Sequence, residues 1–320
     1  MGRVVARTGF LVVAVLLCAV VWAQSHRKPP NKRPPQRWDQ RILNAFFEDI
    51  RSAVGPGEPG TAPRTAPGGG SVATTDSGVG DGGATGGFAW SELVSAETLE
   101  DEIKKIALDL EETVASPGRF KSGRHNDARR MFSVSAVVFA VINEYDKDVR
   151  FKDNSAGLRN AVAKAGVNCK VNTDGAYNDA KAKFQQLQEI VRGANVEIPA
   201  PKDPLPHVEV AEYGPLMQRM ELGFLEIVKP GTSSGAEFRS AQEDILHEAE
   251  ILALFSQFFH HESYDYGEDE TFLGLADELQ SQAKALATAT KTGDLNAAQS
   301  AVGAIDKSCT ECHGGYRGWP

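Results

Sequence analysis

The sequence predicts an all-α protein built from two tandem antiparallel four-helix bundles. Beyond about residue 90, the helix-favouring residues Ala, Glu, Leu, Lys and Gln are frequent, and the Val and Ile runs typical of strands are absent. Apolar residues recur there at helical spacing in segments joined by short loops. A proline-rich break from Pro199 to Pro206 divides these segments into two sets of four. We therefore expect one bundle over residues 90–198 and a second over residues 207–320.

The first residues have the features of an export signal. Two arginines precede an apolar core from Phe10 to Val21, and the side chains around Ala23 suit cleavage after that residue. We expect residues 1–23 to be a signal peptide that is removed on export, which predicts a periplasmic protein. The apolar core is short for a membrane span, so membrane association is expected only if the segment stays uncleaved.

Residues 24–89 are predicted to connect the signal peptide to the helical region. Their first part is basic and rich in proline, which predicts an extended spacer. A short amphipathic helix follows, with apolar residues at every fourth position: Trp38, Ile42, Phe46 and Ile50. Residues 55–87 consist mainly of Gly, Pro, Ser, Thr and Ala, which bury too little apolar surface to fold, so we expect a flexible, disordered linker there.

The first bundle is expected to begin with a helix capped by Ser95 and ended by Ser116-Pro117-Gly118. Its apolar stripe consists of Leu99, Ile103, Ile106, Leu110 and Val114. Three further helices are predicted over about residues 126–145, 155–165 and 173–192.

The second bundle repeats this plan after the proline-rich break. Its helices are predicted over about residues 208–228, 237–260, 270–290 and 295–316, and Pro230-Gly231 ends the first of them. A shift of about 118 positions superimposes apolar residues of the two fourth helices, which suggests an internal duplication.

The last predicted helix carries the sequence Cys309-Thr310-Glu311-Cys312-His313. A Cys-x-x-Cys-His run is the attachment signature of a c-type haem, in which two thiols bond the porphyrin vinyl groups and the His is the proximal iron ligand. A redox disulfide would need a βαβ context, and a zinc site would need a second ligand pair; the sequence has neither. We therefore expect one covalent haem c per chain. Export agrees with this, because c-type attachment takes place outside the cytoplasm.

At the duplication shift, the haem motif of the second bundle corresponds to Val191-Arg192-Gly193-Ala194-Asn195 in the first. These residues include no Cys or His. We therefore interpret the first bundle as a haem-less copy.

The second bundle resembles the cytochrome c′ group over about residues 207–320. The resemblance rests on a four-helix pattern with Cys-x-x-Cys-His in the last helix, close to the chain end, followed by an aromatic residue and an arginine, here Tyr316 and Arg317. It implies a haem held inside one end of the bundle, with Tyr316 and Arg317 beside it and Arg317 near its proximal face. It also implies that the first helix of the bundle forms the opposite wall, which offers the iron either an apolar side chain or a Met.

Met217 and Met220 lie in that first helix and are the candidate distal ligands. Met217 is the nearer to the family's distal position, counted back from Pro230-Gly231, and a Met ligand would make the iron six-coordinate and low-spin. A Met on an apolar helix face is also ordinary core filling, which would leave the iron five-coordinate. Pro215 departs from the family's usual polar run, so both interpretations stay open.

The expected function is single-electron transfer by an exported monohaem c-type cytochrome. The alternative is a five-coordinate haem protein that binds NO or CO for gas sensing or buffering. An enzymatic role would need acid–base residues on the distal side, and only Gln218 and Arg219 lie near Met217, so we expect no enzyme. The formal net charge of −9 argues against a nucleic-acid-binding protein.

Other residues and partners are secondary in this interpretation. His247, three residues after Asp244, has no matching second motif, so a di-iron bundle is rejected. Cys169 is expected to be a buried small residue, with an intermolecular disulfide as the alternative. The acidic stretch 265–270 is a solvated loop or a docking surface for a basic redox partner, whose identity is unknown. A homodimer remains open, as does a role of the haem-less bundle as a dimer substitute.

Overall fold

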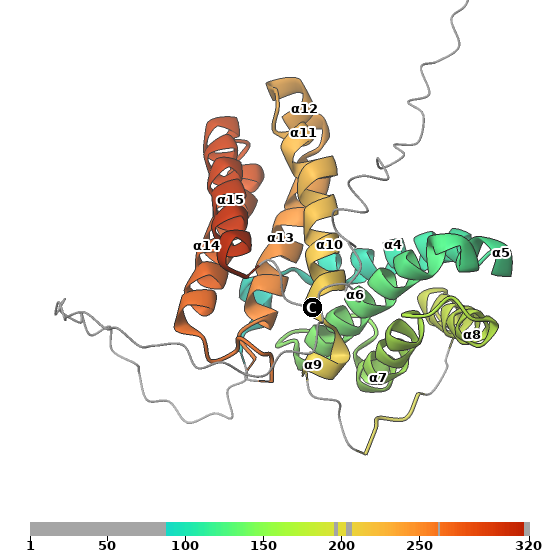
Figure 1. Ribbon diagram of the computed structural model, residues 1–320. Coiled ribbons are helices and arrows are strands. Elements are labelled where there is room, and N and C mark those ends of the chain that lie inside the picture. Colours follow the sequence, from blue (N-terminus) through green and yellow to red (C-terminus); the bar gives the residue numbers. More distant parts are fainter. Residues whose placement is uncertain (1–87, 195–197, 203–206, 262, 317–320) are drawn as a thin grey trace, which may run out of the picture. The chain divides into compact units, whose positions relative to one another are not determined.

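The computed structural model describes residues 88–194, 198–202, 207–261 and 263–316 (Figure 1). Every regular element among these residues is helical, so the predicted all-α class is confirmed. The predicted signal peptide, proline-rich spacer and amphipathic helix lie outside the described residues, as does the linker over 55–87. Among the helices described, we find none with the length and apolar character needed to cross a bilayer.

The first set of helices closes into a ring of four. Its elements are η1 (Trp90–Glu92), α4 (Ala96–Thr113), α5 (Pro117–Arg119), η2 (Phe120–Arg124), α6 (His125–Glu144), α7 (Lys152–Asn168) and α8 (Asp174–Val191). Helix α4 packs against α6 and α8, α6 packs against α7, and α7 packs against α8. Side-chain caps start two of them: the Ser95 hydroxyl accepts from the Thr98 amide at 3.2 Å, and the Thr173 hydroxyl accepts from the Ala176 amide at 3.2 Å.

The second set contains more interruptions than the sequence predicts. Its elements are α9 (His207–Val210), α10 (Tyr213–Gly223), η3 (Phe224–Val228), α11 (Lys229–Gly231), α12 (Gly235–Ser240), α13 (Gln242–Phe258), α14 (Glu270–Thr292) and α15 (Leu295–Tyr316). The single helix predicted over 208–228 is divided between α9 and α10. Pro215 has no amide hydrogen to bond back to residue 211, so it is accommodated in the first turn of a new helix.

The helix predicted over 237–260 is also wrong as a single element. Ala241, with φ −111° and ψ 13°, leaves the helical region and separates α12 from α13. Helices α14 and α15 match their predictions within two residues. Asp269 caps α14, and Gly293 ends it in the left-handed conformation, with φ 73°.

Helices α13, α14 and α15 pack in sequence, and α14 and α15 run side by side in Figure 1. On its other side, α15 forms an ion pair and a hydrogen bond with residues at the end of the α10–η3–α11 segment. Lys229 Nζ lies 2.7 Å from Asp306 Oδ1, and Gln299 Nε2 donates to the Thr232 carbonyl at 2.9 Å. These contacts place the start of α15 beside α11.

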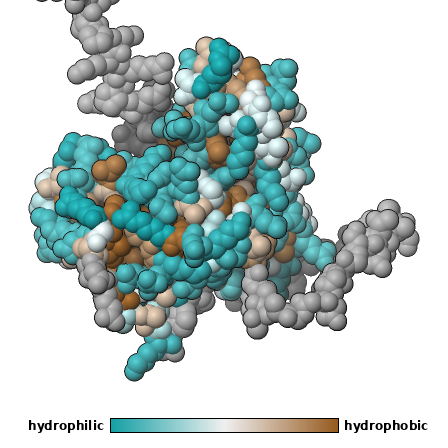
Figure 2. Space-filling view, turned by 180° about the vertical axis from the view of Figure 1, so that it is seen from behind, coloured by the Kyte–Doolittle hydropathy of each residue, from teal (hydrophilic) through white to brown (hydrophobic). Residues whose placement is uncertain are grey.

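The two sets of helices share one hydrophobic core, which extends from Trp90 to Ile305. Helix α10 packs against α6 as well as α13, and α4 contacts α13. The domain boundary predicted between residues 198 and 207, and the haem-less duplication, stay predictions. The face seen in Figure 2 is mainly hydrophilic with small hydrophobic patches, as expected for helices that turn their apolar stripes inward.

Candidate haem site

Helix α15 presents the three residues of the attachment motif on one side. Cys312 and His313 follow Cys309 by three and four positions, which places both about one helical turn from it. All three side chains are half-buried, and both thiols are free. The two cysteines pack at the margin of the hydrophobic core. The residues predicted to attach and ligate a haem therefore lie together, partly accessible, beside an apolar region.

The environment of the two thiols keeps them protonated. Burial, reinforced by the negative charge of Asp306, raises the pKa of Cys309 to about 11. Burial also raises the pKa of Cys312. Thioether formation adds an S–H group across a vinyl double bond, so each thiol supplies both the sulfur and the hydrogen that the bond requires. The chemistry of the two cysteines fits attachment of a porphyrin.

Aromatic side chains gather next to the end of α15. This aromatic cluster consists of Tyr213, Phe259, Tyr264, Tyr266, Phe272 and Tyr316. The Tyr316 ring centroid lies 4.9 Å from that of Tyr266 and 5.3 Å from that of Phe272. Flat apolar rings suit the face of a macrocycle, so the cluster fits a haem attached to this end of α15.

Tyr213 of α10 belongs to the cluster and is close enough to Cys312 for the two to interact electrostatically. Burial raises its pKa above the ordinary range, and its buried hydroxyl donates to no acceptor among the described residues. A buried donor without an acceptor is costly, and a bound group with a polar edge would satisfy it. This is a second feature that fits a haem at this position.

Tyr316 is anchored by the residue that caps α14. Its hydroxyl donates to Asp269 Oδ2 at 3.1 Å, while Asp269 Oδ1 accepts from the amides of Thr271 and Phe272. The structure thus places Tyr316 against the aromatic cluster, on the attachment helix. Arg317, the other residue that the resemblance assigns to the haem, lies outside the described residues.

Met217 follows Tyr213 by one helical turn on α10. The Tyr213 ring contacts Tyr266, which in turn contacts Tyr316 of α15, so this side of α10 borders the aromatic cluster. Met217 is half-buried against the core, and Met220 is 6% exposed. Both methionines therefore lie on the core-facing part of α10. Their role as iron ligands stays a prediction, as do the roles of Cys309, Cys312 and His313.

Arg219, named in the sequence analysis as a neighbour of Met217, points away from this site. It lies about 200° around α10 from Met217 and binds Glu102 of α4 and Glu248 of α13. His247, whose di-iron role was rejected, joins the same group, with Nε2 2.8 Å from Glu102 Oε2. We call Glu102, Arg219, His247 and Glu248 the ion cluster. Sequence reasoning missed it, although Glu102 within the apolar stripe of α4 was a signal for it.

Two further expectations concern residues away from the attachment motif. Cys169 is fully buried, in agreement with its interpretation as a small core residue, and burial raises its pKa to about 12. Within the described part of the chain, His, Cys, Asp and Glu form no group of three or more suited to hold a bare metal ion.

Comparison with known families agrees with this geometry. The family model described as cytochrome C′ matches residues 263–317. Over these residues, the chain is similar to the cytochrome c′ group. The match covers α14 and α15, and with them the attachment motif, Tyr316 and Arg317. No curated protein and no solved structure matches the chain. The match supports a c-type haem protein, and the residues that fit a haem lie at the aromatic end of α15.

Proposed function

We propose that this cytochrome c′ relative is an exported carrier of single electrons, with one haem attached through Cys309 and Cys312 and ligated by His313 and Met217. The observation that carries the proposal is the position of Met217, half-buried on α10 one turn after Tyr213, whose ring belongs to the aromatic cluster beside the attachment helix. A bound haem would supply one-electron exchange at its iron. A Met opposite a His raises the reduction potential.

The residues of the chain would protect and tune such a haem. The aromatic cluster covers its surroundings with apolar surface, which limits contact between the haem and water. Tyr316, held by Asp269, would pack at its proximal side. Asp306 and Glu311 are exposed on the same helix, so negative charge would lie near the haem edge and favour the oxidised state.

The ion cluster supports electron transfer over an enzymatic role. The Arg219 guanidinium makes four hydrogen bonds to Glu102 and Glu248, on the side of α10 turned away from Met217. Arg219 is thereby held away from a substrate bound at the distal side of the iron. The acid–base group that peroxidase-like chemistry needs would have to come from elsewhere.

Export to the periplasm is part of the proposal and rests on the signal pattern of residues 1–23. The chain should be expressed in a bacterium with a working c-type maturation system, and the haem-containing protein purified from the periplasmic fraction. N-terminal sequencing is expected to start at Gln24. A mature protein that retains the apolar core in a membrane fraction would contradict export as a soluble carrier.

The visible spectrum of the oxidised protein tests the distal ligand. Met ligation predicts low-spin Soret features and a sulfur-to-iron band at the red end of the spectrum. Met217→Ala is expected to remove that band and to give a high-spin protein that binds CO or NO readily. Met220→Ala is the matched control, since Met220 lies deeper in the core and should keep the low-spin spectrum. A wild-type protein that is already high-spin would favour the gas-binding alternative instead.

A further inference from the structure

The two sides of helix α10 contact different parts of the protein. Tyr213 and, one turn later, Met217 lie on the side of α10 next to the aromatic cluster, while Arg219 binds Glu102 of α4 and Glu248 of α13. In an α-helix, a rotation about the axis moves both sides together. Whatever holds Arg219 therefore also determines where Met217 points.

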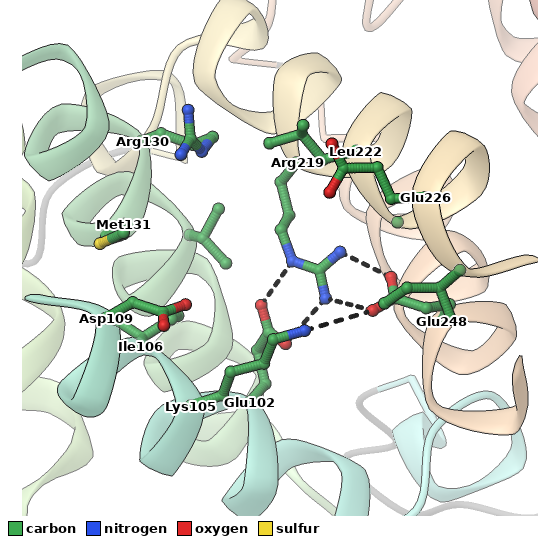
Figure 3. A pocket seen from close by; sticks show the side chains of 13 residues that line it. Glu102, Lys105, Ile106, Asp109, Arg130, Met131, Arg219, Leu222, Glu226 and Glu248 are labelled. Atoms are coloured by element: carbon green, nitrogen blue, oxygen red, sulfur yellow. Dashed lines mark hydrogen bonds and ion pairs between the residues drawn. The ribbon is translucent and has the colours of Figure 1, made fainter. Parts of the chain in front are cut away.

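Arg219 is held by a two-pronged contact with a residue far away in the sequence. Its Nε lies 2.8 Å from Glu102 Oε1 and its Nη2 lies 2.9 Å from Glu102 Oε2, as Figure 3 shows from close by. On its other edge, Nη1 lies 2.6 Å from Glu248 Oε2 and Nη2 lies 3.0 Å from Glu248 Oε1. Paired bonds to a planar guanidinium define its direction as well as its distance.

The ion cluster is buried, so these contacts are not weakened by water. The side chain of Glu102 is 1% exposed, that of Glu248 is 2% exposed and that of Arg219 is 11% exposed. Burial by itself would raise the pKa of Glu102, but Arg219 and then His247 outweigh it and hold that pKa far below its usual range. Glu102 is therefore an anion in the folded protein at neutral pH.

The orientation of α10 depends on the ion cluster, because other packing on this side of the helix is incomplete. A cavity of about 170 Å³ lies beside Arg219, lined by residues of α4, α6, α10, η3 and α13, so apolar packing of α10 against α6 is incomplete there (Figure 3). On the other flank, Gly223 lets Glu248 pass close to the helix, because a Cβ at that position would lie 1.9 Å from Glu248 Oε2. The ion cluster is thus the main directional contact on this side of α10.

We propose that Glu102 is a positioning residue for the haem site: through Arg219 it holds the rotation of α10 and so the placement of Met217 opposite His313. This inference rests on the proposed function, because it assigns the first set of helices a role towards the haem of the second. Those helices are then more than a dimer substitute. They supply Glu102, which holds α10 in the rotation that places Met217 opposite His313.

The test compares Glu102→Gln with Glu97→Gln in the mature, haem-loaded full chain. Both variants remove one negative charge from α4, but Glu97 is exposed, with no contact to the ion cluster. Hydrogen–deuterium exchange is followed in α10 and in α14, and the oxidised visible spectrum is recorded. We expect Glu102→Gln to speed exchange in α10 about 30-fold relative to α14 and to add a high-spin fraction. Glu97→Gln should do neither.

A second variant separates positioning from simple stabilisation. Arg219→Lys keeps the positive charge but lacks the planar fork, so it should largely preserve the urea midpoint while still adding high-spin haem. If Glu102→Gln speeds exchange equally in α10 and α14, or if both variants leave the spectrum of a Met217-ligated protein unchanged, Glu102 has no positioning role.

Failure of the proposed function has a different signature. If Met217→Ala leaves the spectrum unchanged, Met217 is not the ligand and the proposed ligation is wrong. Selective exchange in α10 would then still decide whether Glu102 holds the helix in place.

Discussion

Removal of the Arg219 side chain offers the sharpest stability test of the ion cluster. In Arg219→Met, the buried carboxylates of Glu102 and Glu248 lose all four hydrogen bonds from the guanidinium, which are 2.6–3.0 Å long. Charge-assisted bonds are worth about 1.5–3 kcal/mol each, but the variant no longer has to desolvate the guanidinium. Breaking a buried pair by removing one partner costs about 3–5 kcal/mol, and we expect a loss of unfolding free energy in that range at pH 7.

The pH dependence of this loss has a definite sign. In the wild type, the pKa of Glu102 is lower in the folded state than its ordinary value of 4.5, so its stabilising effect is complete above that pH and is lost as the pH falls. In Arg219→Met, burial is no longer outweighed by Arg219, and the pKa of Glu102 is expected to rise above its ordinary value. The variant then gains stability as Glu102 takes up a proton. The difference in unfolding free energy between the wild type and Arg219→Met, which we call the gap, should therefore narrow from pH 7 to pH 5.

Urea unfolding followed by far-ultraviolet circular dichroism at both pH values measures this gap. Arg239→Met is the matched control, because Arg239 is exposed on α12, and its unfolding free energy should change by less than about 0.5 kcal/mol. Replacing Glu102, Arg219 and Glu248 together by Met removes the charges as a group and should recover most of the loss. A loss below about 1 kcal/mol at pH 7, or a gap that stays constant down to pH 5, would refute this account of the cluster.

Two further predictions concern the fit between the two sets of helices. Gly223→Ala should destabilise the protein by about 2 kcal/mol or more, because the new Cβ would displace Glu248. Gly274 has open space around it on α14, so Gly274→Ala should instead stabilise the protein by about 1 kcal/mol. Thermal unfolding measures both changes. A fragment of residues 207–320 should aggregate or expose apolar surface, since it lacks the α6 surface on which α10 packs and the α4 surface that contacts α13. A monomeric, cooperatively unfolding fragment in analytical ultracentrifugation and calorimetry would show that α10 needs no such support.

Much of the haem site could be predicted from the sequence, because its key features are local. Cys309, Cys312 and His313 share one side of α15 through the helical repeat alone. The start of α14 at an Asp269 cap and its end at Gly293 likewise depend on neighbouring residues. The interruptions at Ala211–Glu212 and Ala241 were missed, because apolar periodicity continues across both positions and tolerates a change in backbone direction.

The sequence by itself determined the all-α class, the attachment motif and the last two helices, since hydrophobic periodicity, caps and motif spacing act over a few residues. The tertiary structure alone decided which way α10 faces. Glu102 and Arg219 are 117 positions apart, and no local pattern relates them. Their pairing arises only when packing removes water from both charges, because an unpaired buried charge is then too costly to keep. In this way the fold, and not the sequence pattern, paired Arg219 of α10 with Glu102 of α4.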